Sequence, residues 1–451
     1  MQLKTKTIWC FTIEFLQTFA HIYYDRLPIS LLLLRDFQKF TEKNLSKIDT
    51  RFIKRQPESS IQKACEPYLL KSRPKQNAGG YILARADLYP LTKNSKQSYI
   101  YLAHHKNEYK RMLRHKQCRP LYNLSSLPEK KLPVSEAKRV MQELNRIFKN
   151  RQTPALYRKK YFCTWMRKTV KKLLVSIRKL HTLFEKYPIS KTLYGSTINR
   201  HGVLVTTFAQ SRHICTINFQ HGILGDIGHL PLNADMNLVW GKSHQKFLEF
   251  HGAPKEKIKI VPPYFPKSHI HQKSSPPPSR RISTPPNKHS TSAPYHVLVA
   301  LQPLGEAFNT KMIRDIETAV RPYAPNIRIH YKLHPDQNAS TYKPLLSSIH
   351  SRIHQHGSTS LQQLITLSDF MITHSSAAAY EALLSNKPVY YYSKPKPIYY
   401  LKSQPQFINN QQNTKRLFMK LISTPGLVLQ PMTLNDHLSP VLGTYNIDAF
   451  I

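Results

Sequence analysis

Acidic residues are scarce in this sequence. Asp and Glu together number 25 against 67 Lys and Arg, so the formal net charge at pH 7 is +42. A positive field of this size favours acidic partners, namely nucleic acid, an anionic membrane or a phosphorylated substrate. The hydrophobic content of 40% is nevertheless enough for packed cores, and a length of 451 residues predicts two or three domains.

Long apolar runs are also lacking. A membrane-spanning helix needs about 18 apolar residues in sequence, and the apolar segment at residues 9–24 is interrupted by Glu14, Gln17 and His21. No small-residue cleavage site of a secretory signal follows that segment. We therefore expect residues 8–34 to form one or two helices of a protein core.

Closely spaced cysteine pairs are missing as well. None of the cysteines belongs to a Cys-x-x-Cys motif, which argues against a zinc site and against a disulfide framework. A reducing cytoplasm is the simplest location for such a chain. The five cysteines lie far apart, at Cys10, Cys65, Cys118, Cys163 and Cys215.

Three widespread glycine motifs do not occur. The sequence contains no Gly-x-x-x-x-Gly-Lys-Ser/Thr, no Gly-x-Ser-x-Gly and no Gly-x-Gly-x-x-Gly. A P-loop ATPase, a serine hydrolase of the nucleophile-elbow type and a standard dinucleotide-binding enzyme therefore lose their main sequence support.

Residues 368–392 carry the most informative pattern. An apolar run at residues 370–372 is typical of a buried parallel strand, a helical pattern follows it, and residues 389–392 return to β-branched and aromatic side chains. This order predicts a βαβ unit, and ligands bind at the loop that follows the first strand. The serines of that loop either cap the helix or, with its free N–H groups, hold a phosphate. The loop holds His374, Ser375 and Ser376.

A second predicted strand delivers polar groups to the same edge. Residues 327–333 alternate as a strand does and stop at His334-Pro335-Asp336. A short helical pattern at residues 360–367 separates this strand from the next one. Lys332, close to the strand end, can add positive charge to the edge.

These motifs resemble the donor half of bacterial GT-B glycosyltransferases that build surface polysaccharides. The shared order is Lys-Leu-His-Pro, then Ser-Asp, Thr-His-Ser-Ser, a Glu in the following helix and Lys-Pro-Val. The similar families are capsule-synthesis transferases, including those for Kdo and sialic acid, and CDP-glycerol glycerophosphotransferases. The resemblance implies a CMP- or CDP-activated donor whose phosphates and nearby groups are bound by His334, Pro335, Ser375 and Ser376, and whose ribose is bound by Glu381.

The chain departs from many GT-B enzymes in one respect. With only 13 glycines, it lacks their glycine-rich donor loop. It also has no Asp-x-Asp motif, which is consistent with donor binding without a metal, because helix dipoles and basic side chains can neutralise the departing phosphate. We expect no cofactor.

An earlier loop resembles the acceptor end of the same families. Residues 214–219 predict a buried strand that ends in a glycine-flanked polar loop. His221 in this loop is a candidate base or phosphate partner, with a turn-stabilising hydrogen bond as the alternative. Asp226 either accepts a proton from an acceptor hydroxyl or is an ordinary turn residue. Gln220 and Gly222 complete the predicted acceptor-side loop.

Two further groups are candidates on strand ends. Glu306 follows a predicted strand at residues 296–301 and is a third candidate base, or a sugar contact. The pair His104-His105 follows a predicted strand at residues 99–103, where it is an acceptor-side contact or plain surface; no matching ligand spacing supports a metal site there.

Composition divides the chain into four parts. They are a helical and basic N-terminal region at 1–97, an acceptor-side Rossmann-like domain at 98–265, a Pro- and Ser-rich linker at 266–294, and a nucleotide-donor domain with a C-terminal tail at 295–451. An amphipathic helix at about 154–185 lies within the second part. It either packs on the domain with a solvated basic face or lies on anionic lipid, and the two are compatible.

The sequence thus predicts an α/β protein that is GT-B-like, with two Rossmann-like domains whose parallel sheets face a cleft, plus N-terminal helical additions. The expected activity is transfer of a sugar from a nucleotide-activated donor to a surface polysaccharide or lipid-linked glycan. The alternatives are a CDP-glycerol-type phosphotransferase and a non-enzymatic nucleic-acid-binding protein, although no known nucleic-acid motif is present. We expect a cytoplasmic protein that can dock on the inner face of the cytoplasmic membrane, whose surface is anionic.

Overall fold

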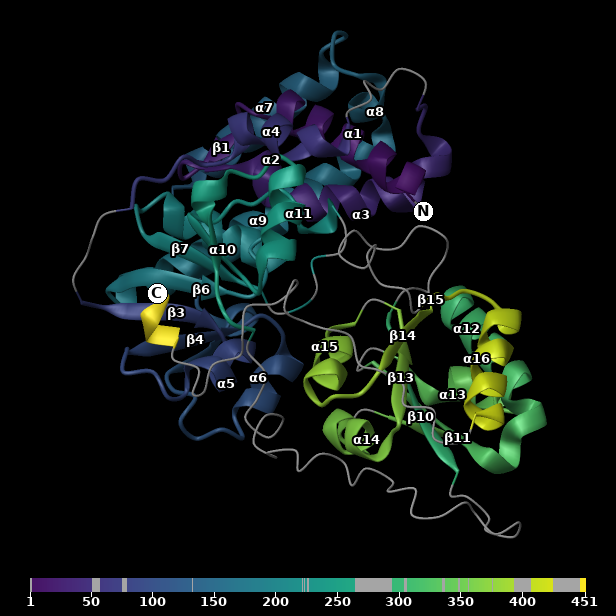
Figure 1. Cartoon of the computed structure of the whole chain (residues 1–451). Coiled ribbons are helices and arrows are strands. Elements are labelled where there is room, and N and C mark those ends of the chain that lie inside the picture. Colours follow the sequence, from purple (N-terminus) through teal and green to yellow (C-terminus); the bar gives the residue numbers. More distant parts are fainter. Residues whose placement is uncertain are drawn as a thin grey trace. The chain divides into compact units, whose positions relative to one another are not determined.

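The structure, a computed structural model, divides into two compact units (Figure 1). Unit 1 comprises residues 1–221, 226–264 and 439–451, and unit 2 comprises residues 222–225 and 265–438. The structure describes residues 2–50, 57–74, 79–131, 133–220, 222, 224, 227–263, 294–303, 306–334, 337–347, 349–355, 357–374, 376–392, 407–424 and 447–451.

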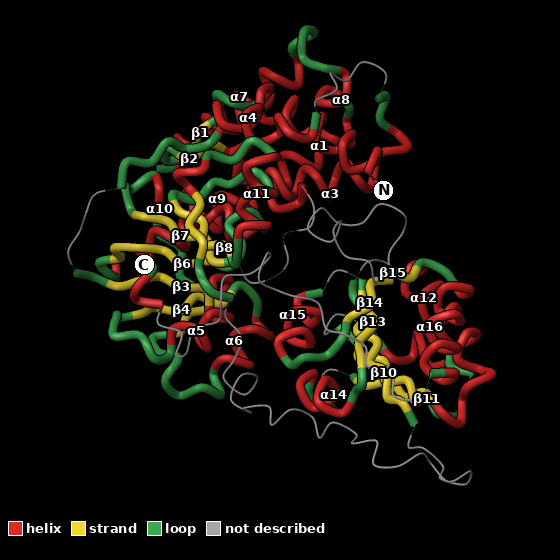
Figure 2. The backbone as a smooth tube through the Cα atoms, in the orientation of Figure 1, coloured by secondary structure: helices red, strands yellow, loops and turns green. Residues whose placement is uncertain are grey.

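Unit 1 is built on a seven-stranded sheet in the order β5-β4-β3-β6-β7-β8-β9. All neighbouring strands are parallel, and Figure 2 shows them as yellow tubes. Their short runs of β-branched and aromatic residues suit strands buried on both faces. The strands are β3 (Tyr81–Arg85), β4 (Tyr99–Ala103), β5 (Leu121–Asn123), β6 (Ile189–Tyr194), β7 (Cys215–Phe219), β8 (Met236–Val239) and β9 (Ile258–Ile260).

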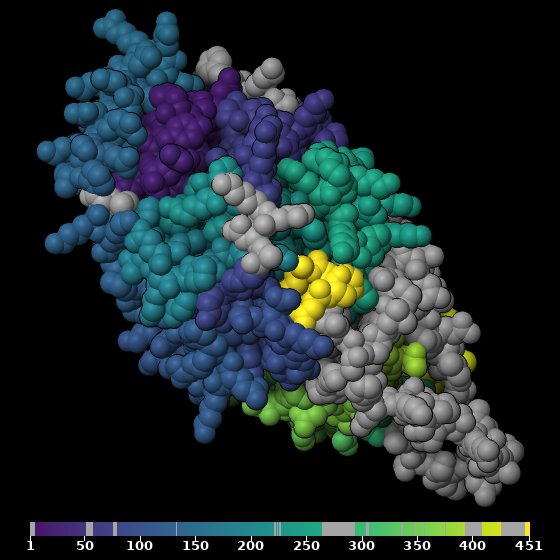
Figure 3. Space-filling model, turned by 90° about the vertical axis from the view of Figure 1, so that its left-hand side faces the viewer, coloured from purple at the N-terminus to yellow at the C-terminus, as the bar shows by residue number. Residues whose placement is uncertain are grey.

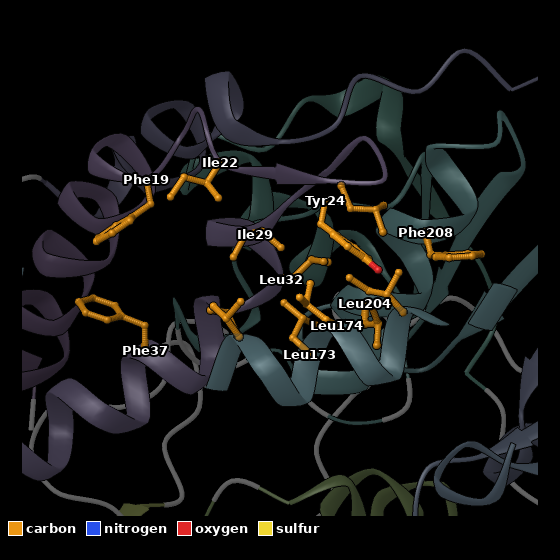
Figure 4. Packing of buried hydrophobic residues seen from close by; sticks show 14 of the residues in the cluster. Phe19, Ile22, Tyr24, Ile29, Leu32, Phe37, Leu173, Leu174, Leu204 and Phe208 are labelled. Carbon is orange, nitrogen blue, oxygen red and sulfur yellow. The ribbon is translucent and has the colours of Figure 1, made fainter. Parts of the chain in front are cut away.

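The N-terminal helices of unit 1 pack into the same core as the sheet. Figure 4 shows Phe19 and Phe37 on one side of this cluster and Leu173, Leu174 and Phe208 on the other. The expectation of core helices at residues 8–34 is therefore confirmed. The helices are α1 (Gln2–Thr18), α2 (Ile29–Leu32), α3 (Leu34–Asn44), α4 (Ile61–Cys65), α5 (Tyr89–Thr92), α6 (Lys106–Met112), α7 (Val134–Lys149), α8 (Ala155–Arg158), α9 (Lys160–Lys186), α10 (Arg200–Gln210) and α11 (Lys242–Phe250), with a hairpin of β1 (Tyr23–Tyr24) and β2 (Leu27–Pro28).

The amphipathic helix predicted at 154–185 is α8 and α9. The apolar face of α9 is buried in the core of unit 1, where Val170, Ile177 and Leu180 are fully inaccessible. This face is therefore not available to enter a bilayer, and any lipid contact must come from the basic face. Among the described residues, we find no helix with the length and apolarity to cross a membrane.

Unit 2 is built on a six-stranded parallel sheet in the order β12-β11-β10-β13-β14-β15. Helices α12 and α16 cover one face, and α14 and α15 lie on the other (Figure 1). The strands are β10 (Tyr295–Ala300), β11 (Ile327–Lys332), β12 (Ser351–His354), β13 (Phe370–Thr373), β14 (Val389–Tyr392) and β15 (Phe407–Ile408). The helices are α12 (Glu306–Val320), α13 (Ala339–Tyr342), α14 (Leu361–Leu367), α15 (Ala377–Leu384) and α16 (Gln411–Ser423).

The two sheets share one connectivity. In each unit the first strand lies in the middle, the second and third strands extend to one side, and the fourth and later strands extend to the other. This is the doubly wound order of a Rossmann-like unit. The predicted α/β class with two parallel Rossmann-like sheets and N-terminal helical additions is therefore confirmed.

The predicted domain limits differ from the structure in two places. Strand β3 precedes residue 98 but lies at the centre of the unit 1 sheet, so residues 1–97 are not a separate region. Residues 447–451 belong to unit 1 rather than to the donor domain, because Asp448 accepts a hydrogen bond of 2.9 Å from the backbone N–H of Lys96. These residues appear as the yellow patch beside the blue part of unit 1 in Figure 3. The linker predicted at 266–294 lies outside the described residues, apart from Pro294.

Candidate functional site

The sheet of unit 2 contains one point where the winding changes direction. Strands β11 and β12 extend from one side of β10, and β13 to β15 extend from the other. The loops after β10 and β13 therefore run to opposite faces and leave a crevice outside the carboxyl ends of these two strands, where ligands bind in such sheets. Helices α12 and α15 begin in these two loops, at Glu306 and Ala377.

Ser376 lies at this point and links the two loops. Its side chain, 6% exposed, accepts a hydrogen bond of 2.9 Å from Nε2 of Gln302 in the loop after β10. It also accepts one of 3.2 Å from the backbone N–H of Ala378, which makes Ser376 the N-cap of α15. The capping role predicted for this serine is present. A phosphate-binding role remains a proposal.

Polar side chains tie the loop after β11 to the same place. The carbonyl oxygen of Gln302 accepts hydrogen bonds from Nδ2 of Asn309 (2.8 Å) and Nε2 of Gln337 (3.2 Å). Gln337 in turn accepts a bond of 2.8 Å from the backbone N–H of His334. The structure thus brings His334 and Ser376 to one edge, as the strand pattern predicted, through Gln302 and Gln337.

His374 lies directly before this edge and is neutral near pH 7. Its ring packs edge-on against Phe308 of α12, with 5.0 Å between the ring centroids. Burial lowers the pKa of His374. A neutral imidazole can accept or donate a hydrogen bond without adding charge. The threonine before it, Thr373, donates a bond of 2.8 Å to the carbonyl oxygen of Ala300 and fixes the ends of β10 and β13 together.

Lys332 has a different environment from the one predicted. Its ammonium donates to the carbonyl oxygens of Gln355 (2.7 Å) and Thr359 (2.6 Å), and so holds the loop that follows β12. Burial lowers the pKa of Lys332. Its role in donor binding therefore stays a prediction, while its role in fixing this loop is visible.

The two carboxylates predicted in unit 2 lie on the helices of this edge. Glu306 is exposed and begins α12, where a negative charge is favoured by the helix dipole. Glu381 is half-buried in α15, five residues after Ser376 in sequence. Their roles as base, sugar contact or ribose ligand remain predictions.

The acceptor-side loop is described only in part. Gln220 is 3% exposed, and its side-chain oxygen accepts a hydrogen bond of 2.8 Å from the backbone N–H of Trp240. This contact holds the ends of β7 and β8 together, so Gln220 does not present its amide to a ligand. Gly222 is described with open space around its Cα. Four predicted site residues lie outside the described residues, namely His221, Asp226, Pro335 and Ser375.

Sequence reasoning missed three residues of this edge. Asn309 and Phe308 belong to the first turn of α12, and Gln337 follows His-Pro-Asp in the sequence. A polar residue three positions after the histidine of a His-Pro pair is a signal in the sequence. It predicts a hydrogen bond to a nearby backbone group, which polar side chains commonly form in turns. Nothing in the sequence marks Phe308 as the partner of His374.

Comparison with known proteins gives similarity in fold only. No protein-family model matches the sequence, and no curated protein matches it. Solved structures similar to this chain include MnaA from S. aureus with UDP, with 13% identity, a TM-score of 0.44 and coverage of 76% of this chain and 87% of that chain. A second is HepE from Anabaena with UDP and glucose, with 12% identity, a TM-score of 0.47 and coverage of 76% and 90%.

A third is the UDP-GlcNAc 2-epimerase from Neisseria meningitidis bound to UDP-GlcNAc, with 12% identity, a TM-score of 0.44 and coverage of 78% of this chain and 94% of that chain. At these identities and TM-scores, the likenesses carry no conclusion about the activity of this chain. Its own structure defines an α/β protein with two Rossmann-like units, each with a complete parallel sheet.

Proposed function

We propose that this protein is a glycosyltransferase that binds a nucleotide-activated sugar at the carboxyl edge of unit 2. The sugar passes to a surface polysaccharide or a lipid-linked glycan. The donor is a CMP-sugar or another nucleotide sugar, and its phosphates lie beside His334 and Ser376, with Ser375 and Pro335 in the same loops. Glu381 takes the ribose, and His221, Asp226 and Glu306 are the candidate bases.

The hydrogen bond between Gln302 and Ser376 is the observation that carries this proposal. It places the starts of α12 and α15 at the same crevice, on the two sides of the change in winding. Helix starts offer free N–H groups and a positive dipole end to a phosphate. In such a site, stabilisation of the departing nucleotide is the main catalytic effect, and it requires no metal ion.

A CDP-glycerol-type glycerophosphotransferase is the second candidate, because the sequence motifs at His334 and Ser376 are shared with that family. The same phosphate contacts serve both reactions, so the donor assay separates them. A non-enzymatic nucleic-acid-binding protein is the third candidate, and the net charge of +42 alone favours it.

The location proposed for the protein is the cytoplasm, with contact to the inner face of the membrane. No Asp or Glu occurs between Glu143 and Glu185, a stretch that includes all of α8 and most of α9. Exposed lysines on it include Lys159, Lys160 and Lys168. These lysines can contact anionic lipid, each contributing about 1 kcal/mol near the surface.

The decisive experiment is a thermal-shift panel of CMP, CDP, UDP, GDP and ADP on the wild type and on Ser376→Ala. A ligand that binds only the folded protein raises its melting temperature. The matched control is Ser360→Ala, which also removes a serine N-cap in unit 2, at the start of α14 and not in the loops after β10 and β13. We expect one nucleotide to stabilise the wild type and Ser360→Ala but not Ser376→Ala.

Two outcomes would count against the proposal. One is equal stabilisation of Ser376→Ala, which would place the nucleotide elsewhere. The other is no shift with any nucleotide together with tight, salt-dependent binding to DNA, which would support the nucleic-acid alternative. A second assay uses the sugar donor that carries the stabilising nucleotide. It measures release of the free nucleotide with and without EDTA, and so tests both the transfer and its independence from metal.

A further inference from the structure

Unit 1 has its own change of winding, between β3 and β6. Strands β4 and β5 extend to one side of β3, and β6 to β9 extend to the other. A crevice outside the carboxyl ends of β3 and β6 follows from this order, as it does in unit 2. Arg85 ends β3, and Tyr194 ends β6. Of the residues that gather here, the pair His104-His105 was a candidate from the sequence, whereas Arg85, Tyr194 and His201 were not.

Three histidines from two distant segments meet at this edge, and we name them the histidine cluster. His104 and His105 follow β4, while His201 lies in the first turn of α10. The ring centroids of His104 and His201 are 4.9 Å apart, and those of His105 and His201 are 5.4 Å apart. His104 stacks on the buried ring of Tyr194, with its Nε2 3.3 Å from the phenol oxygen.

The loop that carries His201 is tightly folded. Asn199 caps α10 by accepting a hydrogen bond of 2.7 Å from the backbone N–H of Gly202. A Cβ atom on Gly202 would lie 1.9 Å from the carbonyl oxygen of Ser196, so no other residue fits there without a shift of the backbone. Glycine at position 202 therefore allows the first turn of α10, which contains His201, to pack closely against Ser196.

Burial and nearby charges act on the imidazoles of the cluster. Burial, followed by the charges of Arg200, His105 and Arg85, lowers the pKa of His201 to about 4. Burial is also the main reason why the pKa of His104 lies well below its usual value. Both imidazoles are therefore neutral near pH 7. His105 and Lys106 are the exposed members of this edge.

The nearby carboxylates are engaged by other groups. Glu108 and Asp87 pair with Arg85 at 3.3 Å and 3.2 Å, and Glu108 also accepts a hydrogen bond from the backbone N–H of His104. Asp36 pairs with Arg200 at 3.2 Å. Arg85 and Arg200 are thus already ion-paired, and the groups of the cluster that can meet an entering anion are the imidazoles. Each imidazole that takes a proton beside the anion gains a charge-assisted hydrogen bond.

We propose that the histidine cluster binds a phosphate group of the acceptor substrate and that His201 takes up a proton as the phosphate enters. That the ligand is the acceptor substrate rests on the proposed glycosyltransferase function. Binding of a phosphate group at the histidine cluster does not depend on that function. The ring nitrogens of these histidines can donate N–H groups to the oxygens of a phosphate. Among the described residues, no group of three His, Cys, Asp or Glu side chains is arranged to hold a metal ion.

The test is isothermal titration calorimetry of the full chain with inorganic phosphate, and with sulfate, at pH 6 and pH 8, in two buffers of different ionisation enthalpy. Phosphate itself titrates between these pH values, so the proton uptake is measured with sulfate, whose charge stays constant. We expect tighter binding at pH 6 and uptake of about one proton. His201→Gln should weaken phosphate binding about tenfold, the value of one charge-assisted hydrogen bond, and abolish the proton uptake. His105→Gln, an exposed position that folding does not require, should weaken it as well. His21→Gln, an exposed histidine elsewhere in unit 1, is the matched control.

The results separate this site from the donor site. The nucleotide shift of the preceding experiment should persist in His201→Gln, so failure of one proposal leaves the other standing. Phosphate binding that is lost in Ser376→Ala but kept in both histidine variants would overturn the present inference, as would binding without proton uptake. Vesicles of phosphatidylcholine with phosphatidic acid, compared with glycerol phosphate in solution, distinguish a lipid-borne phosphate from a soluble one.

Discussion

Gln302 donates a hydrogen bond of 2.9 Å to Ser376 across the two strands where the unit 2 sheet changes its winding. Ser376 is at once the cap of α15 and the acceptor for the neighbouring loop. A binding edge built in this way keeps its shape before any ligand arrives, because each helix start is fixed by a side chain from its own or the adjacent loop. Such preorganisation lowers the cost of binding.

Replacement of Ser376 by alanine should lower the melting temperature of the protein. Loss of an N-cap costs about 1 kcal/mol, which corresponds to roughly 2–4 °C for a unit of this size. Ser376→Thr keeps the hydroxyl and should melt close to the wild type. Differential scanning fluorimetry checks both, and a Ser376→Ala protein as stable as the wild type would show that the cap contributes nothing.

Glu317 is a buried carboxylate that joins three elements of unit 2, and its removal should be severe. It accepts hydrogen bonds from the hydroxyls of Tyr331 (2.9 Å) and Ser351 (2.7 Å) and from the backbone N–H of Ser347 (2.9 Å). Glu317→Ala leaves these donors buried without an acceptor, at a cost of about 3 kcal/mol or more. Glu317→Gln keeps one acceptor oxygen and should cost less.

Urea denaturation, followed by fluorescence, measures the Glu317 effect. Glu256→Ala, an exposed glutamate, is the control and should change stability by no more than about 0.5 kcal/mol. If Glu317→Ala and Glu317→Gln unfold at the same urea concentration, hydrogen bonding to this carboxylate is not what stabilises the unit.

A row of histidines should make unit 2 sensitive to acid. His330 lies between His296 and His354 on neighbouring strands, with ring nitrogens 3.0 Å and 3.1 Å apart. Burial, followed by the charges of its neighbours, lowers the pKa of His330 to about 4, while an unfolded histidine titrates near pH 6.5. The unfolded chain therefore binds protons first, and stability should fall as the pH drops from about 6.5 towards 4. The other groups that face the row are Arg328, Arg352, Lys332 and Asp369.

Thermal melting at pH 7, 6, 5 and 4.5 checks this dependence. His330→Gln removes the titrating group at the centre of the row and should flatten the decline over this range. A decline of the same steepness in the variant would assign the acid sensitivity to other groups.

Arg35 connects the N-terminal helices to the loops of the unit 1 sheet. From α3 it donates to the carbonyl oxygens of Ile198 (2.9 Å) and Leu230 (3.0 Å). A lysine lacks the rigid planar fork with which the guanidinium reaches both carbonyl oxygens, so Arg35→Lys should destabilise the protein by about 1–3 kcal/mol. Arg139→Lys on the exposed side of α7 is the control.

The Arg35 variant has a second consequence. Because Ile198 belongs to the loop that carries His201, Arg35→Lys should also weaken phosphate binding at the histidine cluster. Melting temperature and calorimetry measure the two effects separately. Unchanged phosphate affinity in a destabilised variant would show that this loop holds its position without Arg35.

Removal of exposed lysines from α8 and α9 should reduce binding to anionic vesicles. The triple change Lys159→Gln, Lys160→Gln and Lys168→Gln removes about 3 kcal/mol of attraction, or roughly a hundredfold in affinity. The control removes Lys93, Lys96 and Lys116, which are also exposed in unit 1. Co-sedimentation with phosphatidylserine vesicles at two salt concentrations measures the difference, and equal losses in the two triple variants would argue for net charge rather than this face.

The sequence allowed correct prediction of one strand from its alternation and of another from its continuous apolar run. Residues 327–333 and 370–372 became β11 and β13, and the helix after Ser376 became α15. These elements are local, since burial on both faces of a parallel strand leaves a visible run of apolar residues. Strand β3 was missed because its five residues follow a turn in a long basic stretch and carry no alternation.

Contacts between distant segments were beyond the sequence. His104 and His201 lie far apart along the chain, and only the strand order β4-β3-β6 brings their loops together. Lys332 and Gln220 looked available for ligands, but the structure commits them to backbone groups. A polar residue at a strand end can bind either a ligand or a backbone group of its own chain. Which of the two it binds depends on whether the next loop leaves a carbonyl or N–H group that needs a hydrogen-bond partner.

The placement of residues 447–451 has a consequence for biosynthesis. Unit 1 includes these residues, which Asp448 ties to the segment before β4, although unit 2 lies between them and the rest of unit 1 in the sequence. A ribosome therefore delivers residues 447–451 of unit 1 only after all of unit 2 has been made. Completion of unit 1 thus waits for the synthesis of unit 2.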